Sequence, residues 1–161
     1  MRKQKGFSLI ELLIVVAIIL IIAAIAVPNL LRSRMSANEA SAVGSMRSIN
    51  TAEVAYSTNY PTVGYSVLLA DLGGTCSATT APTSTSACLI DQTLAGATSA
   101  NTSKSGYYFT YAQVGGGPGY TLNGDAAQQG SSGVKHFYTD ASAVIRYNTS
   151  AAATASDAAI Q

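Results

Sequence analysis

One acidic side chain stands alone in the longest apolar stretch of the sequence. Glu11 lies near the start of the run from Phe7 to Val27, which contains no other charge. A helix of this length, rising about 1.5 Å per residue, spans a bilayer core of roughly 30 Å. A carboxylate in that layer costs about 2–4 kcal/mol, so we expect Glu11 to have a partner or a function. The alternative is an incidental acid that reaches toward the lipid headgroups.

The residues around Glu11 carry a resemblance to a known family. The sequence Gly6-Phe7-Ser8-Leu9-Ile10-Glu11 follows the short basic stretch Met1–Gly6 and precedes the apolar run. This pattern resembles the processing signature of type IV pilins and of the pseudopilins of type II secretion. The resemblance extends from the start of the chain to about Ala55. It implies that a prepilin peptidase removes the leader, residues 1–6, by cutting after Gly6, and methylates the new N-terminal amine of Phe7.

Cleavage before Phe7 gives Glu11 a physical role in assembly. The cut leaves a positively charged amine at Phe7, which on one subunit can meet Glu11 of a neighbour in a stack of such helices. Opposite charges attract strongly in a bundle of low dielectric constant, and an unpaired charge is strongly disfavoured there. A different interpretation is an ordinary secretory signal cut after Ala24-Ile25-Ala26, which would leave a mature chain starting at Val27.

Charge and composition favour a self-associating subunit over a nucleic-acid-binding protein. The leader holds three of the nine basic residues, so the processed chain has six basic against eight acidic residues, a formal difference of −2. Charged residues make up 11% of the chain. We therefore expect no contact with nucleic acid.

A second, amphipathic half of the helix is predicted for residues 28–59, after the membrane-spanning and filament-core half at 7–27. Pro28 at the junction predicts a kink or a locally unwound segment, and a role in assembly. The resembled family often has Gly eight residues before this Pro, where this chain has the good helix former Leu20. Apolar residues spaced by three, four and seven form a stripe, with Arg32, Arg34, Glu39, Arg47 and Glu53 mostly off its centre. The stripe consists of Leu31, Met35, Ala42, Met46, Ile49, Ala52 and Tyr56.

Residues 60–105 are predicted to be a connecting segment held by a disulfide. Pro61 ends the helix, and short helical or turn pieces are expected at Val67–Leu72 and Leu89–Ala95. Cys76 and Cys88 are the two cysteines of the chain and lie close in sequence in its exported part, which favours a disulfide over free thiols.

An antiparallel sheet of about four strands is predicted for residues 106–147. Tyr107, Phe109 and Tyr111 alternate as in a strand, and further strands are expected at Tyr120–Asn123, Gly133–Asp140 and Val144–Tyr147. The residues after Asn148, 148–161, are predicted to be a low-complexity tail, mobile or on the filament surface. The fold class is therefore α+β and type IV pilin-like, with the long helix packed on the sheet.

Signals for catalysis, metals and cofactors are weak, and we expect no enzyme, no cofactor and no metal. His136 is the single histidine and is expected to be structural. Asp125 and Asp140 could contribute to a calcium site, but no dense run of oxygen ligands surrounds them. Gly115–Gly119 leads to no helix with a lysine, so it is a poor phosphate cradle. Two glycosylation triplets, at Asn101–Ser103 and Asn148–Ser150, remain hypotheses.

The sequence as a whole favours a structural subunit of a type IV pilus. The resemblance implies an inner-membrane precursor, processing by the peptidase, and assembly with copies of itself into an extracellular surface filament by an assembly platform and a cytoplasmic ATPase. Adhesion, twitching motility or DNA uptake are the roles it implies. Two alternatives are a pseudopilin of type II secretion and a monomeric membrane-anchored binding domain.

Overall fold

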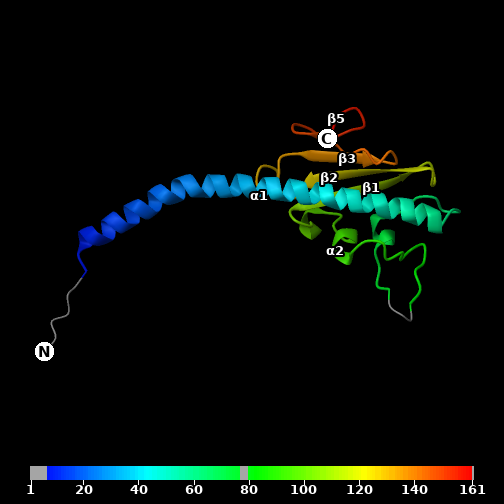
Figure 1. The fold of residues 1–161 in the computed structure, drawn as a ribbon, viewed down its shortest axis with the longest axis horizontal. Coiled ribbons are helices and arrows are strands. Elements are labelled where there is room, and N and C mark those ends of the chain that lie inside the picture. The colour runs from blue at the N-terminus through cyan, green and yellow to red at the C-terminus, as the bar shows by residue number, and fades with distance from the viewer. Residues whose placement is uncertain (1–6, 77–79, 161) are drawn as a thin grey trace. The chain divides into compact units, whose positions relative to one another are not determined.

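The computed structural model describes residues 7–76 and 80–160. It contains one long helix, α1 (Leu9–Asn59), followed by short helical turns and a five-stranded sheet (Figure 1). The chain divides into two units, the first ending at Arg34 and the second beginning at Met35. The N-terminal part of α1 belongs to the first unit, and the second contains the rest of α1 together with the sheet.

Within the second unit, α1 turns one face to the core, as the stripe of apolar residues predicts. The helix ends at Asn59, because Pro61 disfavours helical angles at the residue before it. Glu53, expected off the centre of the stripe, is instead fully buried on it. The buried residues of the helix are Ala42, Ser45, Met46, Ile49, Asn50, Ala52, Glu53 and Tyr56.

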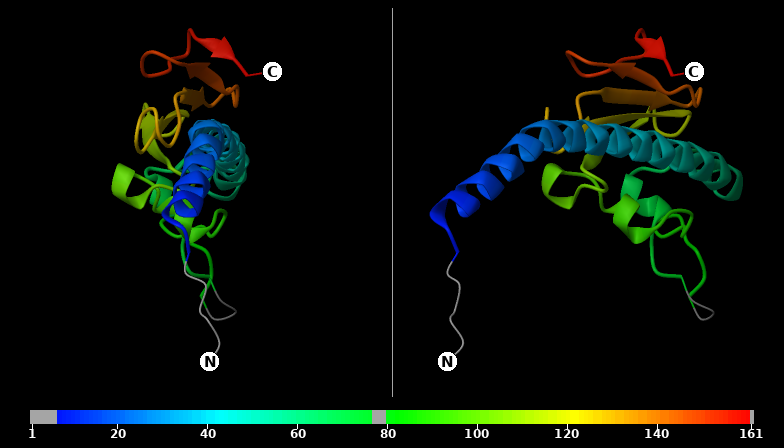
Figure 2. Two further views of the ribbon diagram at one scale, coloured as in Figure 1. Left: turned by 90° about the vertical axis from the view of Figure 1, so that its left-hand side faces the viewer. Right: turned by 60° about the vertical axis from the view of Figure 1, so that its left-hand side comes forward.

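The sheet is an antiparallel meander in which each strand pairs with the next one along the chain (Figure 2). Its strands are β1 (Tyr107–Val114), β2 (Gly119–Ala126), β3 (His136–Asp140), β4 (Arg146–Asn148) and β5 (Ala158–Ala159). The turn between β1 and β2, residues 115–118, is short, as antiparallel neighbours allow. The predicted α+β architecture, a long helix packed on an antiparallel sheet, is therefore confirmed.

Alternating side chains of the sheet form one buried cluster with α1. Phe109, Leu122 and Phe137 come from three successive strands and join Met46 and Ile49 of the helix. Polar groups inside this layer are paired: the Tyr120 hydroxyl donates to Asn50 Oδ1 at 2.8 Å. The amide of Asn50 in turn donates to the buried Thr139 hydroxyl at 3.1 Å. These bonds fix the helix against the middle of the sheet and give each of these buried groups a partner.

The C-terminal residues take part in the sheet, whereas the sequence predicts about four strands followed by a low-complexity tail that is mobile or on the filament surface. Ala158 and Ala159 form the fifth strand on β4, and the Ile160 amide donates to the Ile145 carbonyl at 2.8 Å. Asp157 accepts a hydrogen bond from the Thr154 amide at 2.7 Å and another from the Asn148 side chain at 2.9 Å. This segment of small and polar residues therefore folds back onto β4, because side chains such as that of Asp157 accept hydrogen bonds from its backbone amides.

The connection between α1 and the sheet contains short helical pieces near the two predicted ones. They are η1 (Leu69–Leu72), α2 (Gln92–Ala95) and η2 (Ala100–Thr102). The glycine-rich turn before β2 packs on this connection: the Tyr65 amide donates to the Gly117 carbonyl at 3.1 Å. A Cβ atom on Gly64 would lie 2.3 Å from the same carbonyl oxygen. The glycines therefore allow the backbone of this turn to pack directly against the backbone of the connection.

Glu39 ties α1 to the segment before β3 and should make stability depend on pH. Burial opposes its charged form most strongly, but hydrogen bonds from Val134 and Lys135 outweigh this and lower the pKa of Glu39 below the ordinary 4.5. The carboxylate accepts from the Val134 amide at 3.0 Å and pairs with Lys135 Nζ at 3.1 Å. A carboxyl group whose pKa is lowered on folding stabilises the fold above its unfolded pKa.

We therefore expect Glu39→Gln to destabilise the second unit by about 1 kcal/mol at pH 7. The difference from wild type should shrink as the pH falls from about 4.5 through the lower pKa of folded Glu39, below which both chains are neutral at this position. Denaturant unfolding of both proteins at pH 7 and pH 3, in the same detergent, measures the two differences. An equal difference at both pH values would show that the charge of Glu39 contributes nothing.

Candidate processing and assembly segment

The apolar segment Phe7–Val27 exposes its large side chains in the isolated chain. These residues range from 45% exposed at Val16 to 82% exposed at Phe7. Among the described residues, α1 is the one helix long and apolar enough to cross a membrane by length and composition. So large an exposed apolar surface requires a covering partner, either lipid or other protein.

Glu11 is the sole charge of this segment and has a contact within its own chain. The Ser8 amide donates a hydrogen bond to Glu11 Oε2 at 2.8 Å. Because α1 begins at Leu9, Ser8 is the residue just before the helix and Glu11 is in its first turn. In the part of the chain that the structure describes, no Lys, Arg or His side chain forms an ion pair with Glu11. The carboxylate thus has a hydrogen-bond donor but lacks a cation among these residues.

The structure bears differently on the other residues predicted to act in processing and assembly, which are Gly6, Phe7 and Pro28. A kink or a locally unwound segment is expected at Pro28, and of these two the unwound segment is not present, because helix α1 is continuous from Leu9 to Asn59. Neighbouring backbone hydrogen bonds hold the helix on both sides of the missing donor. Gly6 and the rest of the predicted leader lie outside the described residues. Cleavage after Gly6, methylation of Phe7, and roles for Glu11 and Pro28 in assembly therefore stay predictions.

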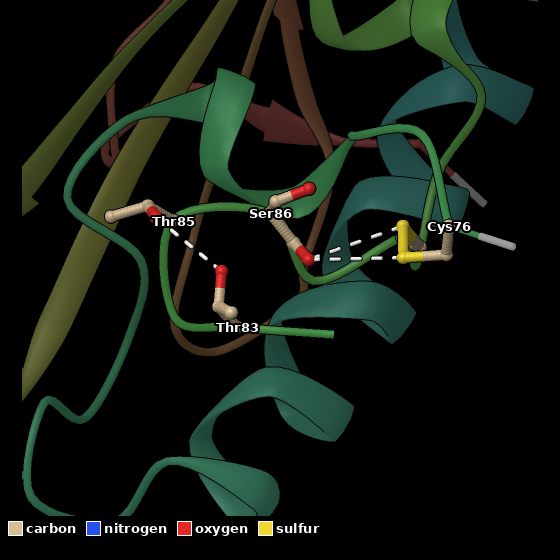
Figure 3. Close-up of a disulfide and its surroundings, with 5 residues drawn as sticks. Cys76, Thr83, Thr85 and Ser86 are labelled. Atoms are coloured by element: carbon tan, nitrogen blue, oxygen red, sulfur yellow. Dashed lines mark hydrogen bonds between the residues drawn. A yellow bond between two sulfur atoms is a disulfide. The ribbon is translucent and has the colours of Figure 1, made fainter. Parts of the chain in front are cut away.

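The predicted disulfide is confirmed. Cys76 and Cys88 are joined, with their Cα atoms 6.1 Å apart. Figure 3 shows the two sulfur atoms near the Ser86 carbonyl oxygen, which lies 3.9 Å from each. The backbone beside the bridge is anchored independently, since the Cys88 amide donates to the Gly73 carbonyl at 2.8 Å. The Tyr56 hydroxyl also donates to the Ser84 carbonyl at 2.6 Å, so the enclosed loop is attached to α1.

Replacing both cysteines by serine should lower the free energy of unfolding of the second unit by about 3 kcal/mol. The unfolded chain gains freedom when a loop of this size is no longer closed, whereas the hydrogen bonds of Gly73 and Ser84 keep the folded loop in place. Denaturant unfolding followed by tyrosine circular dichroism measures the loss. Reduced wild-type protein serves as the matched control and should lose the same amount; a double variant as stable as the oxidised protein would contradict the prediction.

The residues considered for metal binding or catalysis are used in local contacts. His136 Nδ1 lies 2.6 Å from Asp125 Oδ1, across the neighbouring strands β2 and β3. Asp140 accepts from the Ser142 amide at 2.9 Å in the turn after β3. Burial opposes the charged form of Asp140, but hydrogen bonds from Ser142 outweigh it and lower the pKa of this carboxyl. Within residues 7–76 and 80–160, no group of three or more His, Cys, Asp or Glu side chains is placed to hold a metal ion.

A polar site that the sequence analysis missed lies between α1 and the connection. Glu53 is fully buried, and its carboxylate accepts from the Ser66 hydroxyl at 2.5 Å and from the Ser66 amide at 3.1 Å. The Tyr111 hydroxyl donates to the Ser66 carbonyl at 2.9 Å. Burial, aided by the nearby Glu53 carboxylate, raises the pKa of Tyr120 well above its usual range. Tyr120 therefore remains a neutral donor at physiological pH.

The comparisons with known proteins define the class of the N-terminal segment. Residues 1–27 match the family model described as the prokaryotic N-terminal methylation motif. This match covers the basic stretch, the Gly6-Phe7 junction, Glu11 and the apolar run together. The resemblance to the type IV pilin and pseudopilin family is thereby confirmed for the N-terminal part of the chain.

Three curated proteins share this part of the sequence. The type IV wide pilus major component PilA4 of Thermus thermophilus is 64% identical over 39 residues, which are 24% of this chain and 30% of that protein. The type IV major pilin protein PilA of Myxococcus xanthus is 41% identical over 54 residues, 34% of this chain and 24% of the relative. The type II secretion system core protein G of Vibrio cholerae is 40% identical over 65 residues, 38% of this chain and 44% of the relative. The chain thus spans less than half the length of each relative, and no solved structure matches it significantly.

Proposed function

We propose that this chain is the structural subunit of a type IV pilus filament. The observation that carries the proposal is the exposed apolar segment Phe7–Val27, which bears the methylation motif and a single carboxylate without a cationic partner in the described chain. Two of the similar proteins are major pilins, which are structural proteins. A structural role also agrees with the local use of His136, Asp125 and Asp140 described above.

The proposed assembly begins in the inner membrane, where the apolar half of α1 is covered by lipid. A prepilin peptidase removes residues 1–6 and methylates the amine of Phe7. The helix then moves into the filament core, where apolar side chains of other copies replace the lipid. In that core Glu11 pairs with the Phe7 amine of a neighbouring copy, and the pair sets the axial position of each new subunit.

The proposed filament also requires partners that this chain does not encode. Extracting a helix that carries the exposed apolar segment Phe7–Val27 from a bilayer is costly, so an assembly platform and a cytoplasmic ATPase are needed to drive it. The finished filament lies outside the cell. Adhesion, twitching motility and DNA uptake are the roles we propose for it.

The second candidate is a pseudopilin of type II secretion, and the similarity to the Vibrio cholerae core protein G favours it. A strain lacking this chain distinguishes the two when it is scored for surface fibres and for enzymes in the medium. We expect fibres to disappear while secretion continues, and complementation to restore the fibres. Lost secretion with fibres unchanged would establish the pseudopilin role instead. Loss of neither would contradict both, and a membrane-anchored monomer would then be favoured.

A further inference from the structure

The start of helix α1 contains a contact that the proposed filament does not use. Ser8 and Glu11 occupy the first and fourth positions of a Ser-x-x-Glu sequence, the pattern of a helix capping box. Of the two hydrogen bonds of a capping box, the structure contains the one accepted by the glutamate: the Ser8 amide donates to Glu11 Oε2 at 2.8 Å. The carboxylate also lies at the positive end of the helix dipole, which favours its charge.

This contact bears on how Glu11 is tolerated before assembly. First-turn amides of a helix lack intrahelical acceptors, and lipid offers none. A carboxylate that reaches back to the Ser8 amide satisfies one such donor and gains a partner itself. The side chain that would pair with a neighbouring copy is therefore already engaged by its own chain. Because Phe7 precedes Ser8 directly, an amine created at Phe7 would lie beside the same carboxylate.

We propose that Glu11 is held in the unassembled subunit by the Ser8 amide of its own chain, and that polymerisation exchanges this contact for the amine of a neighbouring copy. Only the exchange on polymerisation rests on the proposed function; the capping contact in the unassembled subunit does not. Ser8 is then a positioning residue through its backbone, and its side chain is dispensable. Glutamine at position 11 should keep the capping contact but lose the charge needed for the exchange.

The test follows the Ser8 amide in the full-length precursor in lipid bicelles. Phe7-Ser8 is the one Phe-Ser pair in the sequence, so carbonyl-labelled Phe with nitrogen-labelled Ser gives an NMR signal from this amide alone. We expect its hydrogen exchange to be about tenfold slower in wild type than in Glu11→Ala. Glu11→Gln should retain at least part of this protection. The Leu9 amide, isolated by the unique Ser8-Leu9 pair, serves as the internal control and should exchange alike in all three proteins.

Wild-type protein, processed and assembled, tests the exchange. Wild-type subunits labelled at the Glu11 carboxyl are mixed with subunits labelled at the Phe7 amine, and solid-state NMR of the filaments should detect the two groups in contact. Equal Ser8 exchange rates in wild type and Glu11→Ala would overturn the proposal while leaving filament formation untouched. A protected Ser8 amide in the precursor together with filaments that lack the Glu11–Phe7 contact would overturn the exchange. Failure of wild type to form any filament would refute the proposed function, not the capping contact.

Discussion

Glu11→Ala should leave the protein inserted in the membrane and folded but reduce filament yield by roughly a hundredfold or more. Removing the carboxylate leaves the Phe7 amine of each added subunit unpaired inside the filament core. An unpaired buried charge costs about 3–5 kcal/mol, and each step of about 1.4 kcal/mol corresponds to a factor of ten in affinity. The yield is measured as subunit recovered from sheared filaments relative to subunit in the membrane fraction.

The controls for this experiment separate charge from size and from folding. Glu11→Gln keeps the length of the side chain and should assemble as poorly as Glu11→Ala, since the amide cannot neutralise an amine. Outside this segment, the Cys76–Cys88 bridge should form equally in all variants and shows that the second unit is folded. Filaments at wild-type yield from either variant would mean that charge pairing does not drive assembly.

Glu53→Ala should lower the free energy of unfolding of the second unit by about 3 kcal/mol or more. The side chain is fully buried and accepts two hydrogen bonds from Ser66. Its removal leaves the Ser66 amide and hydroxyl buried without an acceptor, and a cavity beside them. The same change should loosen the connection after α1, because Tyr111 holds the other side of Ser66.

Val54→Ala provides a matched control one position along the helix. Val54 is 58% exposed, so its truncation should change stability by no more than about 0.5 kcal/mol. Denaturant unfolding of both variants in the same detergent gives the comparison, and amide exchange of residues 60–66 reports the loosening. Equal stability of the two variants would show that the buried Glu53 cluster does not contribute to the fold.

Much of the fold can be predicted from the spacing of apolar residues along the sequence. At Glu53, however, the position in the helix and the residue type predict opposite degrees of burial. Met46, Ile49, Glu53 and Tyr56 are spaced by three, four and three, so the phase of the stripe places Glu53 in the core. Residue type favours the surface instead, because an unpaired buried carboxylate is costly. The conflict is resolved by Ser66, which lies beyond the end of the helix and donates from both its backbone and its hydroxyl. Such a partner cannot be found from the helix sequence alone.

The C-terminal residues show a different limit. Alternating aromatic residues predict β1 to β3, whereas β5 consists of two alanines in a run of small residues. Its position depends on Asp157, which bonds with Thr154 and Asn148 and turns the chain back onto β4. The candidate processing and assembly residues, by contrast, could be predicted from the sequence. The Gly6-Phe7 junction and Glu11 are evident there, because their chemistry depends on their order along the chain. The Ser8–Glu11 capping contact was also encoded there, as Ser-x-x-Glu.

The mass of the N-terminal peptide from purified surface filaments decides whether the proposed processing and charge pairing can occur. We expect the peptide to begin at Phe7 and to carry one methyl group on its amine, with residues 1–6 absent. That terminus is the charge that Glu11 of a neighbouring copy would neutralise. A filament subunit with its leader intact, or a protein beginning at Val27, would contradict the proposed assembly, because neither has a charged amine beside Glu11.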